Sequence, residues 1–317
     1  MERFELTTLF EKAHFIRAFE NAVAAAADAG DVPGLVHLAN GAEIMELAVA
    51  AQLNGPVDQV TGSHRSHGLA IAMGADPSAV AKEILGLDGG LSGGLGGTQH
   101  LMAPEVGFLT ANGIVGGQVP LAAGAALSAK TNATGGIAVT FFGDGAANQG
   151  AVLETLNLAV ALKLPMLFVL LNNGMAQSTA VTYATGGTGL LARARAFGLA
   201  SEQVDGGDIE AATNVAERLV AWVRDTSSPA FLEAAVPRLS GHYHGDSEVY
   251  RQRSSEDDPL DRAATYLVSQ GIDMDDLARL RSNQQKAAGE LVAAARSAPD
   301  TSDSAFADWQ TAEGHGA

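Results

Sequence analysis

The stretch IAVTFFGDGAANQGAVLETLNLAVALKLPMLFVLLNNG, residues 137–174, decides the fold of this chain. Residues 137–142 are an apolar run that ends at Gly-Asp-Gly, and residues 166–171 are a second apolar run that ends at Asn-Asn-Gly. Short apolar runs between turn residues predict buried strands. A helix that Pro165 ends is predicted between them from the residues Leu153, Leu156, Asn157, Val160 and Ala161. The stretch therefore predicts two parallel strands joined through a helix, with a right-handed crossover.

The chain downstream repeats this alternation of strand and helix. Asp208 is suited to cap a helix that runs to Val223, and Pro229 precedes an apolar strand from Ala230 to Val236. Alternating strands and helices are typical of the α/β class. We therefore expect a doubly wound parallel sheet.

Helices are predicted at both ends of the chain. A helix with one apolar face opens it, from the spacing of Leu6, Leu9, Ala13 and Ile16, and the segment from Asp31 to Gly34 breaks that helix. Residues 260–269 and 274–298 also have helical patterns, whereas the stretch from residue 299 onward is weakly patterned. We expect residues 1–255 to form the main domain and residues 256–317 a helical C-terminal extension.

Composition excludes several classes of function. The 317 residues are 47% hydrophobic and 17% charged, which is typical of a chain with a sizeable core, and the formal net charge of -17 argues against nucleic acid or an anionic membrane as a partner. The absence of cysteine excludes disulfides, thiolate catalysis and cysteine metal sites. Residues 1–20 are too charged for a secretory signal, and no apolar run reaches membrane-spanning length, so we expect a cytoplasmic protein.

Glycines crowd residues 86–97. One interpretation is a loop whose backbone must pass close to another group, since glycine permits such an approach. The other is a flexible surface loop. The glycines alone favour neither.

Two polar residues end consecutive predicted strands. Asp144 follows the first strand and Asn173 the second. Open parallel sheets bind ligands at the carboxyl ends of their strands, so we expect the two side chains to share one pocket. Both offer the hard oxygen ligands that Mg²⁺ prefers, and Mg²⁺ commonly completes its shell with phosphate oxygens. Gly143 and Gly145 would let the turn approach a diphosphate at the start of the following helix.

The segment from GDG at residue 143 to NN at residue 173 resembles the signature of thiamine-diphosphate enzymes. Three upstream motifs, HLANGAE (37–43), SHRSHG (63–68) and NGIVGGQVPLAAG (112–124), and the downstream SGHYHGD (240–246) are similar to alpha subunits of acetoin and 2-oxoacid dehydrogenase complexes. The resemblance covers most of the chain, from about Phe10 to Arg251. It implies the thiamine-diphosphate-binding type of α/β fold.

The resemblance implies a set of site residues. Asp144, Asn173 and the carbonyl of Met175 would hold Mg²⁺. The residues implied at the cofactor are His64, Arg65, Gly113, Val115, Asp144, Gly145, Ala146, Asn173, Met175 and His242. Among these, Gly145 and Ala146 would donate N–H groups to the diphosphate, Arg65 would contact a diphosphate oxygen, and Gly113 and Val115 would hold the aminopyrimidine through backbone atoms. The implied catalytic residues are His37, His67 and His242.

Several positions depart from the pattern of the resembled subunits. His64 stands where pyruvate-type members often carry Tyr, and acetoin-type members resemble this chain there. Tyr243 stands where mitochondrial pyruvate enzymes carry a regulated Ser, so that phosphorylation switch should be absent. The other departures are Ala42, Leu95, Met175 and Ser240.

The resemblance implies the alpha subunit of an enzyme that cleaves a C–C bond next to a carbonyl group, in acetoin or a small 2-oxo acid. The glutamate that activates the cofactor would come from a beta subunit with the pyrimidine-binding domain, so we expect an α2β2 assembly, with a lipoyl acyltransferase as a further partner of a dehydrogenase. A two-subunit carboligase of a specialised pathway is the main alternative. A transketolase-like transferase, or a non-catalytic partner that keeps the fold, is a third. The sequence does not name the substrate.

Overall fold

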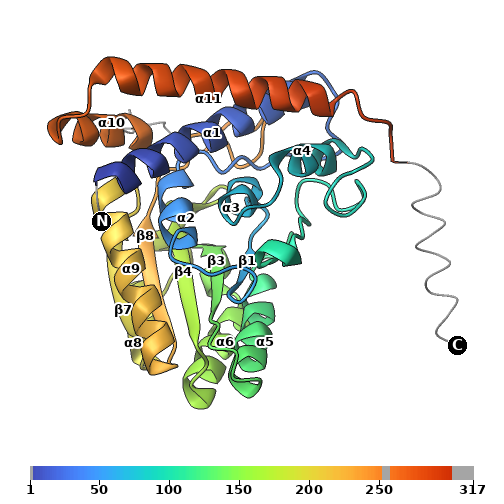
Figure 1. The fold of residues 1–317 in the computed structure, drawn as a ribbon. Helices are drawn as coiled ribbons and strands as arrows, with labels where there is room; N and C mark the ends of the chain where they lie inside the picture. The colour runs from blue at the N-terminus through green and yellow to red at the C-terminus, as the bar shows by residue number, and fades with distance from the viewer. Residues whose placement is uncertain (1–2, 252–257, 302–317) are drawn as a thin grey trace, which may run out of the picture.

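A computed structural model describes residues 3–251 and 258–301 of the chain. Its centre is a six-stranded parallel sheet with the strand order β2-β1-β3-β4-β8-β7, most of which is visible side by side in Figure 1. The strands are β1 (Gln59–Gly62), β2 (Phe108–Ala111), β3 (Ala138–Gly143), β4 (Met166–Asn172), β7 (Ala200–Asp205) and β8 (Ala230–Ala235). A small antiparallel hairpin joins β5 (Met175–Ala176) to β6 (Thr179–Ala180). The predicted α/β class with a parallel sheet is confirmed.

Helices cover both faces of the sheet. They are α1 (Arg3–Asp28), α2 (Glu43–Ala50), α3 (His67–Ala72), α4 (Pro77–Leu85), α5 (Gln118–Thr131), α6 (Gly150–Leu162), α7 (Val181–Ala184), α8 (Leu190–Ala196), α9 (Ile209–Thr226), α10 (Pro259–Ser269) and α11 (Met274–Ala295). One hydrophobic core lies under α1, α2, α9 and α11, and a second lies under α5, α6 and α8. Along β3, Val139 and Phe141 enter the first core while Ala138 and Phe142 enter the second. This alternation explains why the strand reads as a continuous apolar run.

The predicted strand–helix–strand unit is present as β3, α6 and β4. β3 and β4 are parallel neighbours, and Gly143 at the end of β3 pairs with Leu171 near the end of β4. The buried residues of α6 are Val152, Thr155, Leu156 and Ala159, whereas Leu158 and Leu162 on the same helix remain 46% and 42% exposed. The helix is therefore apolar on its outer side as well.

The predicted terminal helices are also present. Leu6, Leu9, Ala13 and Ile16 on α1 are all buried, and α10 ends at Ser269 as expected. Helix α11 ends at Ala295, slightly before the predicted residue 298.

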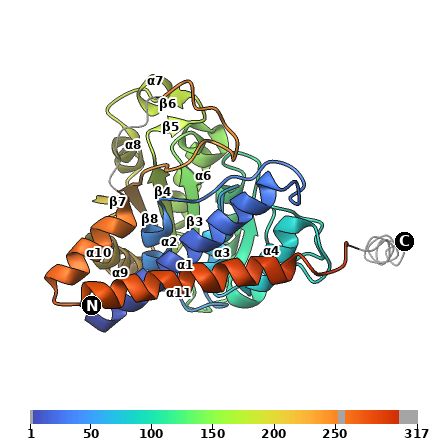
Figure 2. The ribbon, with the colours of Figure 1, turned by 90° about the horizontal axis from the view of Figure 1, so that it is seen from above.

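α11 lies along α1, as both ribbon views show, and its Leu277, Ala288 and Val292 are buried in the same core as α1 (Figures 1 and 2). The predicted boundary at residues 255 and 256 falls outside the described residues, so the domain division stays a prediction. Within those residues, the longest helices are too polar to cross a membrane.

The strand order reverses between β1 and β3. From β1 the chain continues outward to β2, whereas from β3 it continues to the other side through β4. Such a reversal leaves a crevice at the carboxyl ends of the two central strands, because their outgoing connections pass to opposite faces. β1 was not predicted: it is a four-residue strand without a long apolar run.

Candidate functional site

A pocket lies at this crevice and is built from the segments that leave four neighbouring strands. Residues 63–65 follow β1, residues 143–146 follow or end β3, residues 173–177 follow β4, and residues 236–238 follow β8. Further wall residues are Leu38, Ala39, Asn40 and Ala42 of the N-terminal segment, and Asn112, Val115, Gly116 and Gln118. The pocket is thus formed where the topology of an open parallel sheet places its ligand.

Asp144 and Asn173 both line this pocket, as predicted from their places at the strand ends. Asp144 is 2% exposed; its Oδ1 accepts a hydrogen bond from Gly145 N at 2.7 Å, while its Oδ2 is buried without a partner among the described residues. Burial raises the pKa of the Asp144 carboxyl, and neighbouring backbone N–H groups offset part of that rise. A buried carboxylate oxygen without a donor is costly, and a bound cation would satisfy it.

Met175, the third predicted metal ligand, also lines the pocket, and its N–H donates to Asn173 Oδ1 at 3.1 Å. This bond holds Met175 against Asn173. Gly145 is close to the same segment, since a Cβ atom on it would lie 2.5 Å from the Cβ of Ala176. Only glycine therefore lets the turn after β3 pack against the hairpin after β4. The donor set of Asp144 and Asn173 fits a hard divalent cation.

Arg65 lines the pocket beside this donor set. It is held by main-chain oxygens: Nη1 donates to Leu38 O at 2.8 Å and Nη2 donates to His242 O. Burial and the nearby Arg238 lower the pKa of the Arg65 guanidinium to about 10, so it remains charged at neutral pH. A buried cation that contacts only neutral groups is suited to an anionic ligand.

Arg238 is a pocket residue that the sequence analysis missed. It is 4% exposed, lines the pocket, and donates through Nη2 to Tyr250 Oη at 3.0 Å and Gln177 O at 3.3 Å, while its Nε is buried without a partner among residues the structure describes. Arg238 lies in the segment that leaves the carboxyl end of β8 at Ala235, so the rule that selected Asp144 and Asn173 points to this segment. The pocket therefore offers two guanidinium groups.

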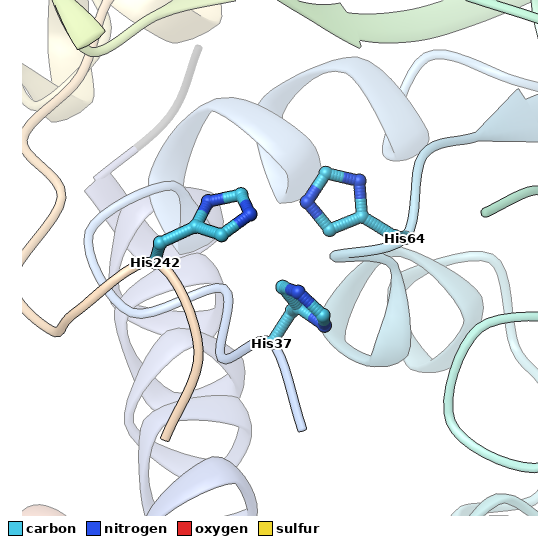
Figure 3. Close-up of side chains that lie close together, drawn as sticks. All are labelled: His37, His64 and His242. Atoms are coloured by element: carbon cyan, nitrogen blue, oxygen red, sulfur yellow. The ribbon is translucent and has the colours of Figure 1, made fainter. Parts of the chain in front are cut away.

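Three histidines cluster together (Figure 3): His64 and His242 line the pocket, and His37 lies against both. The ring centroids of His37 and His64 are 4.6 Å apart, those of His37 and His242 are 5.1 Å apart, and those of His64 and His242 are 5.7 Å apart. Burial and the neighbouring Arg65 lower the pKa values of His37, His64 and His242 to about 4, about 2 and about 4. All three imidazoles are therefore neutral at pH 7.

The ligand atoms of these three histidines lie within 4.8 Å of one another. By residue type alone, three histidines are suitable ligands for a transition metal. However, Arg65 Nη2 lies 3.2 Å from His242 Nδ1. The guanidinium charge opposes a second cation at this distance. We therefore interpret the cluster as neutral hydrogen-bonding groups and not as a metal centre.

His67 lies outside the pocket, whereas His242 lines it and His37 lies against His242 with ring centroids 5.1 Å apart. It is fully buried at the start of α3; Nδ1 is 3.1 Å from Glu20 Oε2, and Nε2 is 2.5 Å from Thr98 Oγ1. Both ring nitrogens thus have protein partners. The structure does not bring His67 to the group formed by His37, His64 and His242, and its catalytic role stays a prediction.

Of the two residues predicted at the aminopyrimidine, Val115 lines the pocket and is 53% exposed. Gly113 does not line it and packs against the glycine-rich loop, since a Cβ on Gly113 would lie 2.6 Å from Gln99 Oε1. Gln99 Nε2 in turn is 3.5 Å from His37 Nδ1. Among the departures from the resembled subunits, His64, Ala42 and Met175 line the pocket, whereas Leu95 is 52% exposed on the loop.

The glycine-rich loop wraps around one buried carboxylate. Glu83 is fully buried, and its two oxygens accept hydrogen bonds from the backbone N–H groups of Ser92 (2.7 Å), Gly94 (2.9 Å), Gly96 (2.6 Å) and Gly97 (3.2 Å). A Cβ on Gly90 would lie 2.5 Å from Glu83 Oε2. Of the two interpretations of this loop, the close approach of its backbone to another group is the one observed.

The chain matches the family model of the dehydrogenase E1 component over residues 11–303. It is 40% identical over 258 residues (81% of this chain, 77% of the relative) to the alpha subunit of acetoin:2,6-dichlorophenolindophenol oxidoreductase of Cupriavidus necator, and 36% identical (93% and 90%) to the Bacillus subtilis protein of the same name. It is also 35% identical (95% and 87%) to the alpha subunit of the pyruvate dehydrogenase E1 component of Zymomonas mobilis. Together with the parallel sheet and its strand-end pocket, these matches show that the chain belongs to the thiamine-diphosphate-dependent dehydrogenase E1 component family.

Proposed function

We propose that this chain is the alpha subunit of a two-subunit, thiamine-diphosphate-dependent enzyme that cleaves the C–C bond next to the carbonyl group of acetoin or a small 2-oxo acid. The observation that carries the proposal is the pocket itself. It holds the unpartnered carboxylate oxygen of Asp144 together with the guanidinium groups of Arg65 and Arg238. A metal-bound diphosphate would complement both the carboxylate and the two cations.

In this proposal Asp144, Asn173 and the carbonyl oxygen of Met175 hold Mg²⁺. Arg65 and Arg238 would bind the diphosphate, and Gly145 and Ala146, which begin a short 3-10 turn ahead of α6, would donate N–H groups to it. The positive end of a helix favours an anion there. When bound, the cofactor supplies a nucleophilic carbon that adds to the substrate carbonyl and accepts the electrons of the broken C–C bond.

The histidine cluster supplies hydrogen bonds and proton transfer. Neutral imidazoles can donate or accept a hydrogen bond, and His64 and His242 line the pocket with His37 next to both. His242 is fixed through its backbone: its N–H donates to Asp246 Oδ2 at 2.8 Å, and the Tyr250 hydroxyl donates to the same oxygen. We assign His242 to the substrate and its intermediates, because its ring faces those of His37 and His64 (Figure 3). His37 is assigned the same task, and His64 and Val115 are assigned to the cofactor.

We further propose that the active form is an α2β2 assembly. The relatives are named as alpha subunits, and in this chain the rim residues Ile114 and Val115 are 71% and 53% exposed. Helix α5 begins just after this rim, and its Leu121 and Leu127 are 46% and 45% exposed next to the exposed leucines of the adjacent α6. Clustered exposed apolar side chains mark interaction surfaces, so we assign this face to contacts within the assembly.

The substrate assignment favours acetoin. Among the relatives described above, the highest percentage identity, 40%, is with an acetoin oxidoreductase. Ser63, His64 and Arg65 line the pocket, and His64 is the residue typical of that type. A lipoyl acyltransferase would accept the acyl group in a dehydrogenase complex. A carboligase remains a second candidate because Ala42 and Met175 depart from the resembled subunits inside the pocket wall, where they would alter the space for an acceptor.

The test is activity of the reconstituted enzyme. The chain would be co-expressed with its beta partner and supplied with thiamine diphosphate, Mg²⁺ and an artificial electron acceptor, with acetoin or pyruvate as donor. Dye reduction with acetoin supports the dehydrogenase. Formation of a ligated hydroxyketone from an aldehyde acceptor, with no dye reduction from either donor, favours the carboligase. Turnover by the chain without a partner contradicts the assembly proposal, and Asp144→Ala serves as the cofactor-deficient control.

A further inference from the structure

Glu46 is an acidic residue in the pocket wall for which the proposed mechanism has no use. It lies on α2, lines the pocket, and is 1% exposed. Its Oε2 is buried and has no hydrogen-bond partner among the described residues. The chain therefore places a polar group at the ligand cavity with nothing of its own to satisfy it.

The charged neighbours of Glu46, which are Glu43 and Glu20, offer it no donor, and Glu20 Oε1 is likewise buried without a partner among the described residues. On α2 itself, Glu43 binds Arg17 of α1 at 2.5 Å and accepts from Gly41 N at 2.8 Å. Glu20 of α1 is paired with His67 of α3 at 3.1 Å. None of these contacts leaves a cation or donor for Glu46. The backbone of α3 also closes on the carboxyl group, since a Cβ on Gly68 would lie 3.0 Å from Glu46 Oε2.

This environment favours the uncharged form of Glu46. Burial, and then the negative charges of Glu43 and Glu20, raise the pKa of the Glu46 carboxyl well above its ordinary value. A protonated carboxyl is a hydrogen-bond donor as well as an acceptor. Glu46 thus differs from Asp144, the other pocket carboxylate, which is adjacent to backbone N–H groups and suited to a metal ion.

We propose that Glu46 is a further ligand-binding residue, a neutral carboxylic acid whose O–H donates a hydrogen bond to an oxygen atom of the molecule bound in the pocket. The inference rests on the proposed function, because that oxygen belongs either to the cofactor or to the substrate. The physical reason is that an unsatisfied buried polar group costs stability, whereas an apolar side chain at position 46 would fill the same space without that cost. A ligand oxygen that accepts a hydrogen bond from Glu46 removes this cost when the ligand binds.

Two substitutions separate the effect of hydrogen-bond donation by residue 46 from the effect of its side-chain shape. Glu46→Gln keeps an N–H donor at the same length and removes the titratable group. Glu46→Met keeps the length and removes the donor. Both would be prepared with the beta partner, and thermal unfolding would first establish that each assembly is folded.

The readouts are cofactor affinity by calorimetry with thiamine diphosphate and Mg²⁺, and KM and kcat with the substrate that the wild-type enzyme uses. Loss of one hydrogen bond corresponds to a change of about tenfold. Glu46→Met should either lower the cofactor affinity or raise KM by about this factor. Glu46→Gln should keep both the cofactor affinity and KM near the wild-type values. A changed cofactor affinity without substrate places the acceptor oxygen on the cofactor, and a changed KM alone places it on the substrate.

The inference is overturned if Glu46→Met leaves both the cofactor affinity and KM unchanged. It is also overturned if Glu46→Gln and Glu46→Met change these quantities equally, since a hydrogen bond donated by residue 46 would then make no contribution. Wild-type protein that binds no thiamine diphosphate would instead contradict the proposed function. The two failures are therefore distinct: the first occurs with an active wild-type enzyme, and the second does not.

Discussion

Replacing Glu83 with Gln should release the glycine-rich loop and lower the stability of the fold. In the wild-type chain each oxygen of Glu83 accepts two backbone N–H groups from the loop, at distances between 2.6 and 3.2 Å. Glutamine keeps one oxygen and puts an NH2 group where the other was. Two loop N–H groups would then face a donor and lose their acceptor.

The size of the effect follows from those two groups. A buried N–H left without an acceptor costs about 1–3 kcal/mol, so Glu83→Gln should lower the free energy of unfolding by about 2–6 kcal/mol. In a domain of this size that corresponds to a fall in Tm on the order of 10 °C. The loop also ends at Thr98 and Gln99, which contact His67 and His37, so kcat should fall as the contacts of these histidines loosen.

Thermal unfolding and amide hydrogen exchange would measure both consequences. The amides of Ser92, Gly94, Gly96 and Gly97 should exchange much faster in Glu83→Gln. Asp88→Asn is the matched control, because Asp88 lies in the same loop but is exposed, and within the described part of the chain the one hydrogen bond its carboxylate accepts is from Gly89 N. If Glu83→Gln unfolds like Asp88→Asn and its loop amides remain protected, the carboxylate is not what organises the loop.

The remaining predictions concern the pocket and the assembly. Asp144→Ala should abolish Mg²⁺-dependent cofactor binding in calorimetry, and unchanged affinity would refute the metal assignment. His242→Ala should lower kcat by about 10²-fold or more while cofactor affinity changes little, as expected for a residue that acts on protons of the substrate; the opposite pattern would assign it to the cofactor. Stability should fall as the pH drops from 6.5 toward about 4, because His37, His64 and His242 have lowered pKa values when folded and take up protons when unfolded; Tm measured against pH should be flatter in His64→Gln. Leu121→Glu with Leu158→Glu should give a folded chain that no longer assembles, as measured by light scattering, and unaltered assembly would place the interface elsewhere.

Much of the fold could be predicted because its central elements have patterns that only one structure satisfies. β3 and β4 are buried on both faces, so each reads as a continuous apolar run ended by polar turn residues. Asp208 caps α9 through hydrogen bonds to Glu210 N and Ala211 N, as its position predicted. By contrast, β7 is an edge strand with mostly half-buried or exposed residues, and β1 and β2 have only four residues each. Such strands depend on pairing with distant partners and leave little trace in local sequence.

The site could be predicted only where a residue's role follows from its place in a strand or motif. Asp144 and Asn173 could be predicted because they follow the carboxyl ends of strands, and Arg238 lies in such a segment as well. Glu46 could not be predicted from the sequence, because an acidic residue on a short helix usually faces solvent. Its burial depends on how α1, α2 and α3 pack together. His67 shows the converse: its motif implies the reacting carbon, but packing gives it Glu20 and Thr98 as partners.

Burial, and then the charges of the pocket, explain why its three central imidazoles are neutral. Arg65 and Arg238 leave the ends of β1 and β8, and neither guanidinium contacts a carboxylate in the ranges described. Their positive charge, added to burial, lowers the histidine pKa values. The guanidinium groups that would select an anionic ligand thus add to the burial that holds the histidines unprotonated, and the pocket favours neutral imidazoles that can donate or accept a hydrogen bond.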